Sequence, residues 1–101
     1  MEVKFKTKKL EKQFLQSKLA EKAYGQDVAK KYIMRINILK SAKSFEELYA
    51  IPTLKFHPLT GNRKGEYAIK LTGFYRLIIT NDGGEVFDIA KIEEVSKHYG
   101  D

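Results

Sequence analysis

The spacing of apolar residues changes near the middle of this sequence, and that change limits the folds open to it. Up to about residue 43 they recur every three or four positions, which is typical of helices with one buried side. From Leu54 onward they alternate with polar residues, as in strands. Because 101 residues can build one core but not two, we expect a single domain over residues 1–101, of the α+β class.

The first half predicts one strand, two helices and a short helical turn. Residues 3–5 alternate as in a half-buried strand. Thr7 can cap the first helix, and Asp27 begins the second, which we expect to end near Lys43. A capping box, Ser44-Phe45-Glu46-Glu47, predicts a helical turn closed by Pro52. The apolar stripes are Leu10, Phe14, Leu15 and Leu19 in the first helix and Val28, Ala29, Tyr32, Ile33, Ile36 and Leu39 in the second.

The second half predicts three to four strands in a meander. The expected strands cover residues 54–57, 67–71, 74–80 and 86–92, and Asn81-Asp82-Gly83-Gly84 is the clearest hairpin signal. The order of strand, two helices and meander places both helices on one face of an antiparallel sheet. The opposite face, or a groove beside it, is then available for a ligand.

Charge is distributed unevenly along the chain. The formal net charge of +6 and the isoelectric point near 9.5 favour a polyanionic partner. Residues 1–50 contain 12 Lys and Arg against 6 Asp and Glu, whereas residues 51–101 contain 7 of each kind. Any chemistry in the second half must therefore depend on individual residues and not on bulk charge.

The residue types also restrict cofactors and location. Without cysteine, and with only two histidines, the chain lacks the ligands of a complete zinc site. We expect no metal and no other cofactor. The first residues lack the apolar run of a signal peptide, and no run is long enough to cross a bilayer. A cytoplasmic protein that does not contact a membrane is the simplest interpretation.

Two basic residues of the predicted sheet carry the strongest functional signal. If the loop between two strands is three residues, Thr72 to Phe74, then Lys70 lies opposite Arg76 on one face. Two adjacent cations are unfavourable unless an anion lies between them. Arg76 could instead form a structural ion pair, with Glu66, Asp88 or Glu93 as partner, and periodicity leaves both interpretations open.

Other polar residues could converge on the same surface. His57 ends a predicted strand where a loop begins, and an imidazole can move a proton near neutral pH. Tyr67, Phe74 and Tyr75 could stack on bases, although we expect at least two of them in the core. The loop Gly61-Asn62-Arg63-Lys64-Gly65 could be a solvated turn or a contact to RNA backbone. The full candidate set is His57, Arg63, Lys64, Lys70, Arg76, Lys91, His98 and Tyr99.

The central segment resembles a known family. The run from Leu59 to Leu71 (LTGNRKGEYAIKL), followed by Tyr75-Arg76-Leu77-Ile78, is similar to HigB-type toxins of the RelE/ParE superfamily. The resemblance implies a RelE-like microbial RNase fold and a ribosome-dependent mRNA endoribonuclease that inhibits translation. It also implies a cognate antitoxin, a HigA-like helix-turn-helix protein. The complex of the two would be a heterotetramer that binds operator DNA through the antitoxin.

The resemblance also assigns roles to residues. Arg76 matches a phosphate-stabilising arginine, Lys70 matches a strand lysine of RelE-like enzymes, and His57 matches a strand-end histidine of HigB-like ones. His98 and Tyr99 correspond to a C-terminal His and Tyr, but their order and the following Gly-Asp differ. We expect His57 or His98 to serve as base or acid. Arg63, Lys64 and Lys91 would bind RNA.

One departure from the pattern limits what is carried over. Ala68 stands where RelE-like enzymes have a second lysine, so a mechanism with two strand lysines does not transfer whole. A ParE-like toxin, which poisons DNA gyrase by contact, and a basic RNA- or DNA-binding module without activity are the alternatives. Cells that express a ribonuclease would lose translation, with cut mRNA. Cells that express a gyrase poison would show DNA damage, and cells that express an inactive binding module would grow normally.

Overall fold

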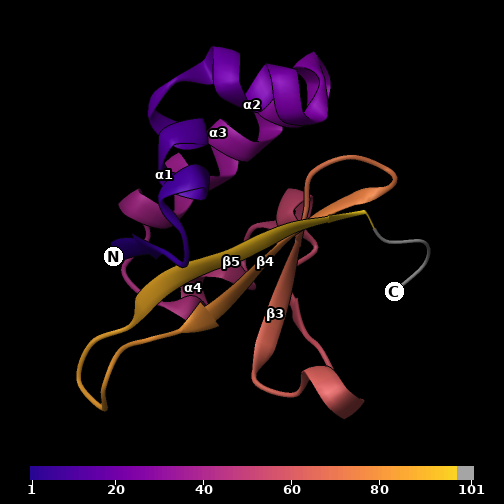
Figure 1. Ribbon diagram of the computed structural model, residues 1–101. Coiled ribbons are helices and arrows are strands. Elements are labelled where there is room, and N and C mark those ends of the chain that lie inside the picture. The colour runs from indigo at the N-terminus through magenta and orange to yellow at the C-terminus, as the bar shows by residue number, and fades with distance from the viewer. Residues whose placement is uncertain (98–101) are drawn as a thin grey trace.

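The computed structural model describes residues 1–97, which form a five-stranded sheet and a group of helices (Figure 1). The helices are α1 (Lys8–Leu15), α2 (Ser17–Tyr24), α3 (Gln26–Ser41) and α4 (Phe45–Leu48), with 3-10 turns at Pro52–Leu54 and Gly61–Arg63. The strands are β1 (Glu2–Phe5), β2 (His57–Pro58), β3 (Glu66–Lys70), β4 (Tyr75–Asn81) and β5 (Ile89–Lys97), in the spatial order β1-β5-β4-β3-β2. The α+β architecture is confirmed.

The sheet is antiparallel except at one edge. β2 to β5 pair antiparallel, as expected, whereas β1 pairs parallel to β5. The prediction of a wholly antiparallel sheet was therefore wrong at β1. A tight hairpin forces its two strands to be antiparallel, but β1 and β5 are joined through nearly the whole chain, and such a connection allows either direction.

The first predicted helix is two helices. The helical conformation is interrupted at Gln16, whose φ of −128° and ψ of 99° are extended. As a result α1 ends at Leu15 and α2 begins at Ser17. The break turns Leu10 and Ala20 into the core but leaves Leu15 68% and Leu19 38% exposed. The expectation that these two leucines belong to the buried stripe was wrong, because the stripe assumed one uninterrupted helix.

The predicted caps and the predicted buried stripe of α3 agree more closely with the structure. The backbone N–H of Leu10 donates to Thr7 Oγ1 at 3.1 Å. Gly25, with a φ of 87° that favours glycine, separates α2 from α3. Ser44 caps α4 as expected, but the Glu47 carboxylate accepts from the Lys43 N–H at 2.6 Å instead of completing the box. Five of the six predicted stripe residues of α3 are buried, and Ile33 is partly buried.

Two predicted strands have different bounds. Residues 52–54 form a 3-10 turn and Lys55 adopts a left-handed φ of 48°, so extended structure in this region is limited to β2. The last strand begins at Ile89, not at Val86, because Asn81 Oδ1 accepts from the N–H groups of both Gly83 and Ile89 and holds the intervening loop closed. Val86 is 82% exposed in that loop.

The core lies between one face of the sheet and the helices. Ile69 of β3, Leu77 and Ile79 of β4 and Ile92 of β5 are fully buried with Tyr32, Ile36 and Leu39 of α3. Tyr67 and Tyr75 pack against this core, whereas Phe74 is exposed, so two of the three aromatic residues are core, as expected. No helix within residues 1–97 has the length and apolar character to span a membrane.

Candidate functional site

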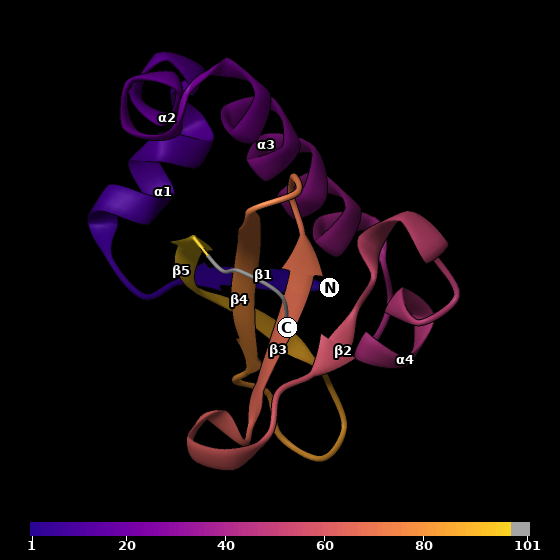
Figure 2. The ribbon, with the colours of Figure 1, turned by 90° about the vertical axis from the view of Figure 1, so that its right-hand side faces the viewer.

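The sheet face opposite the core, called the outer face below, carries a row of three polar residues. Lys70 of β3 lies directly opposite Arg76 of β4, which lies opposite Ser96 of β5. The loop thus has three residues, and the register that the sequence made conditional on this length is the one observed. Since side chains alternate along a strand and Ile69 and Leu77 enter the core, Lys70 and Arg76 extend from the outer face. Figure 2 shows β2, β3 and β4 side by side.

The neighbouring row brings in the histidine. His57 of β2 lies opposite Ala68 of β3, which lies opposite Ile78 of β4. Ala68 and Ile78 are buried and form an apolar strip between the polar groups. Pairing therefore places His57, Lys70 and Arg76 on the same face in adjacent rows, although they come from three strands.

The guanidinium of Arg76 is held by the hairpin that precedes it. Its Nη1 donates to the carbonyl oxygens of Thr72 at 2.7 Å and Tyr75 at 3.1 Å. The three carboxylates considered as ion-pair partners bind other groups. Glu66 binds Arg63, Asp88 accepts from the Phe45 N–H, and Glu93 accepts from Thr80. The hairpin backbone, not one of these acids, thus positions the guanidinium.

Lys70 differs from Arg76 in how it is held. Its ammonium forms no hydrogen bond or ion pair with any other residue in the described part of the chain. Its carbonyl oxygen, however, accepts from Nε of Arg35 at 3.0 Å. The backbone at the end of β3 is therefore fixed while the side chain remains available to an anion.

Arg35 is the residue that sequence reasoning missed. It is only 7% exposed, and it connects α3 to the end of β3 that carries Lys70. A signal was present, because position 35 lies three residues after Tyr32 and four before Leu39, within the buried stripe. A cation at such a position needs a polar partner, and the sequence does not say which one.

The ring of His57 is oriented by the turn that precedes β2. Its Nδ1 lies 2.8 Å from the carbonyl oxygen of Lys55. Because a carbonyl can only accept, this contact requires a proton on Nδ1. In the neutral ring Nε2 then carries the lone pair, which makes Nε2 the atom that can take up a proton.

The three predicted RNA-binding residues differ in their surroundings. Arg63 donates to Glu66 Oε1 at 2.6 Å and to Glu94 Oε2 at 2.8 Å. These bonds, the one to Glu66 first, raise the pKa of Arg63. Lys91 lies 3.9 Å from Glu93, and Lys64 is exposed in the loop before β3. The remaining candidates, His98 and Tyr99, lie outside the described residues.

Several solved toxin structures share this fold. A YoeB/ParE toxin from Agrobacterium tumefaciens superposes with a TM-score of 0.57 at 17% identity, covering 98% of this chain and all of that one. YafQ from E. coli gives a TM-score of 0.58 at 19% identity, covering 95% and 91% of the two chains. A YoeB–YefM complex from Staphylococcus aureus gives 0.53 at 20% identity, covering 98% of both chains. No curated protein sequence matches.

The sequence itself matches one family. The profile of the RelE-like toxin of type II toxin–antitoxin systems, HigB, matches residues 3–91. This range includes β1 from Val3 onward, β2 to β4, the helices, and the strand residues His57, Lys70 and Arg76. The chain therefore belongs to the HigB-like toxins of type II toxin–antitoxin systems, within the RelE/ParE superfamily.

Proposed function

We propose that this chain is a ribosome-dependent, metal-independent endoribonuclease that cuts mRNA in the cytoplasm and so inhibits translation. The observation that carries the proposal is the pairing of Lys70 with Arg76 on the outer face, next to His57. A phosphate placed between these two cations, which lie in register, would be bound by both. Membership of the HigB-like toxins supports the same activity.

The three residues supply the groups that RNA cleavage requires. The 2′-hydroxyl of the RNA attacks the adjacent phosphorus in line, and Nε2 of His57, or His98, takes its proton. Lys70 and Arg76 stabilise the charge of the pentavalent phosphorane. The bond to the 5′ oxygen then breaks, and an acid, for which His98 and Tyr99 are candidates, protonates that oxygen. The products carry a 2′,3′-cyclic phosphate and a 5′-hydroxyl.

Residues beyond this row would hold the RNA. Lys64 is exposed and can reach a phosphate directly, whereas Arg63 and Lys91 are each engaged by carboxylates. Arg63 and Lys91 would contact RNA through the N–H groups that do not bind these carboxylates. We propose Arg63, Lys64 and Lys91 as RNA-positioning residues with no part in the proton transfers.

The proposal includes a neutralising partner. Type II toxins are paired with antitoxins, and one similar fold was solved as a YoeB–YefM complex. We propose a HigA-like helix-turn-helix antitoxin that forms a heterotetramer with this toxin and binds operator DNA. Co-expression of the neighbouring gene should suppress growth arrest.

The decisive experiment is inducible expression with mapping of mRNA 5′ ends. The wild-type chain should stop growth and produce new 5′ ends within translated messages, and Arg76→Ala should do neither. Because Arg76 also contacts the hairpin, circular dichroism must show that the variant folds, and Arg76→Lys should keep part of the activity. A folded Arg76→Ala chain that still arrests growth would contradict the proposal. DNA damage without mRNA cleavage would instead support the gyrase-poisoning alternative.

A further inference from the structure

Ser96 of β5 completes a row of three polar residues on the outer face, called the polar row below. It lies directly opposite Arg76 of β4, which in turn lies opposite Lys70 of β3. The preceding residue, Val95, packs against the core, so alternation along β5 directs Ser96 to the outer face. Three adjacent strands therefore each contribute one hydrogen-bond donor to the polar row.

The hydroxyl of Ser96 is available to a ligand. Among residues 1–97 it forms no hydrogen bond with another residue, and the side chain is only partly buried. Another hydroxyl of the outer face differs in this respect, because Thr80 Oγ1 donates to Glu93 Oε2 at 2.7 Å. Thr80 and Ser96 thus carry the same kind of group on the same face, but the hydroxyl of Thr80 is already engaged.

The spacing of the strands decides what can bridge the polar row. Neighbouring strands lie about 4.8 Å apart, so the backbones at Lys70 and Ser96 are about 10 Å apart with β4 between them. The four-carbon stem of a lysine can cross one strand spacing, whereas a serine hydroxyl stays near its own strand. A phosphate above Arg76 is therefore within reach of both neighbours, and its several oxygens can accept from all three residues.

We propose that Ser96 is a catalytic residue, the third donor of the phosphate site, whose hydroxyl binds a non-bridging oxygen of the scissile phosphate. The inference rests on the proposed ribonuclease function, because that function supplies the phosphate. Ser96 Oγ keeps its proton and forms no covalent bond. Its hydrogen bond strengthens as negative charge grows on that oxygen in the phosphorane.

The surroundings of the polar row explain why a donor from β5 is needed. Ala68 and Ile78, in the adjacent row, are buried and have no polar side-chain atom. Arg76 uses its Nη1 for carbonyl oxygens of the hairpin, so only part of its guanidinium can face a phosphate. A phosphorane has two charged non-bridging oxygens, and each can accept more than one hydrogen bond. The hydroxyl of Ser96 adds a donor without adding a third cation.

A purely structural role for Ser96 is the competing interpretation. On that interpretation a small polar residue merely fits a partly exposed strand position, and its loss would slow the cleavage of every substrate in the same proportion. A donor to one oxygen behaves differently. Sulfur is a poor hydrogen-bond acceptor, so replacing that oxygen with sulfur removes the same bond as removing the hydroxyl.

Phosphorothioate mRNA separates these two roles. The substrate is a short mRNA on programmed ribosomes, with sulfur in place of either non-bridging oxygen at the linkage that the wild type cuts. On normal mRNA, Ser96→Ala should cut about tenfold more slowly, and Ser96→Thr should restore most of the rate. Sulfur at the contacted oxygen should slow the wild type about tenfold more than it slows Ser96→Ala. Sulfur at the other oxygen should slow both proteins equally.

A binding assay tests the phosphate site without cleavage. The probe is uridine vanadate, a cyclic 2′,3′ ester in which five-coordinate vanadium has the geometry of the phosphorane. Vanadium NMR with the full purified chain should show saturable binding. Ser96→Ala should bind the probe about tenfold more weakly, and Ser96→Thr should stay within about threefold of the wild type.

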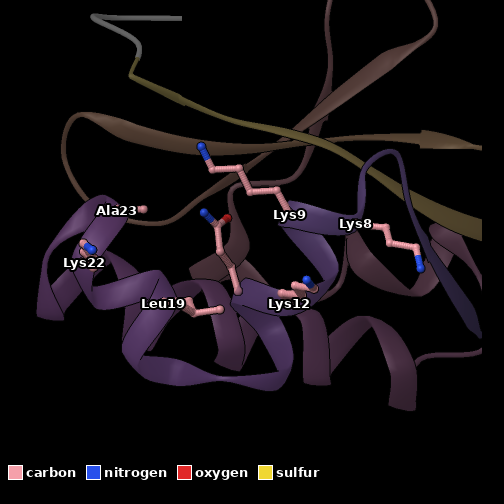
Figure 3. A pocket seen from close by; sticks show the side chains of 7 residues that line it. Lys8, Lys9, Lys12, Leu19, Lys22 and Ala23 are labelled. Carbon is pink, nitrogen blue, oxygen red and sulfur yellow. The ribbon is translucent and has the colours of Figure 1, made fainter.

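Two control variants test whether placement decides the effect. Thr80→Val removes a hydroxyl of the outer face that is already bound to Glu93. Lys12→Gln removes a cation from the helical side, where Lys12 and three other lysines line a hollow of about 530 Å³ between α1 and α2 (Figure 3). Both variants should change the affinity for uridine vanadate less than about twofold. Circular dichroism verifies that every variant is folded.

Two outcomes would overturn the inference. One is a wild-type chain that does not bind uridine vanadate, or that binds it no more tightly than Ser96→Ala does. The other is a Ser96→Ala chain that both phosphorothioates slow in the same proportion as the wild type, which would make the role structural. A chain that binds the probe through Ser96 but cuts no mRNA would support the phosphate site and contradict the proposed function. A chain that cuts mRNA equally well without Ser96 would contradict this inference alone.

Discussion

The helical half and the sheet half of this toxin carry their basic residues in different ways. No lysine of α1, α2 or α3 forms an ion pair within the described chain, and most of these lysines are exposed. In the sheet half Arg63 is held by two carboxylates, Lys91 lies near one, and Arg76 is held by backbone carbonyls. The Lys70 ammonium has no partner among the described residues, but the backbone that carries it is fixed by Arg35. The first half is strongly basic and the second is neutral.

The difference separates attraction from chemistry. Unpaired surface lysines attract an anionic partner and place few demands on geometry, so their effect is sensitive to salt. Stabilisation of a transition state requires groups that are fixed at defined positions. Where carboxylates fix a basic group, their negative charge lowers the net charge of the sheet half. We therefore expect substitutions in the sheet to change reaction rates and substitutions on the helices to change affinities.

The largest expected effect tests this separation directly. Lys70→Ala should lower the rate of mRNA cleavage in a cell-free translation reaction about a hundredfold, because it removes one of two cations that stabilise the phosphorane. Lys30→Ala, which removes an exposed lysine of α3, should change the rate less than about twofold. Similar losses in the two variants would mean that bulk charge, and not placement, decides activity.

A second substitution tests how firmly the sheet half is fixed by backbone contacts. A Cβ at Gly83 would lie 2.0 Å from the Phe87 carbonyl oxygen and 2.9 Å from the Ile89 nitrogen, so Gly83→Ala must shift the β4–β5 loop. We expect a loss of about 2 kcal/mol in the free energy of unfolding, measured by urea denaturation. Gly84→Ala meets nothing within 4 Å and is the control. An equal loss in both would show that the loop is not closely packed.

Arg35 tests whether the two halves are coupled. Arg35→Met keeps the apolar packing of α3 but leaves the Lys70 carbonyl without its donor, which should cost about 1–2 kcal/mol of stability. Cleavage should fall about tenfold under conditions where the variant is fully folded, because the end of β3 is no longer fixed. Arg35→Lys should recover part of the rate. Cleavage that follows only the folded fraction would give Arg35 a purely structural role.

The smallest expected effect depends on pH. The amide N–H of Phe45, followed by the Asn81 side chain, lowers the pKa of Asp88 below the ordinary 3.8. A lowered folded pKa stabilises the fold above 3.8, and this contribution is lost as the pH falls through the folded value. Asp88→Asn should thus be about 1 kcal/mol less stable at pH 7.

The pH profile of unfolding gives the control for that prediction. The deficit of Asp88→Asn relative to the wild type should shrink as the pH falls below 3.8. Asp82→Asn removes only the exposed contact to Lys4 at 3.5 Å and should be nearly neutral at every pH. A deficit that does not depend on pH would assign the effect to packing.

Much of the sheet half could be predicted because its signals are local. Alternation identified β3 and β4, and the loop from Thr72 to Phe74 fixed the register that pairs Lys70 with Arg76. The buried stripe of α3 was equally readable. His57 was placed at a strand end, but only pairing of β2 with β3 brought it beside the two cations.

The sequence alone determined that the first half is mainly helical and the second mainly extended, and it identified five of the six buried residues of α3. It offered the pairing of Lys70 with Arg76 on the condition of a three-residue loop. Periodicity and turn chemistry act over a few residues, so they can be read directly. The tertiary structure decided the parallel direction of β1 and the contact from Arg35 to Lys70. Each depends on contacts between segments distant in the chain, and no local pattern encodes their geometry.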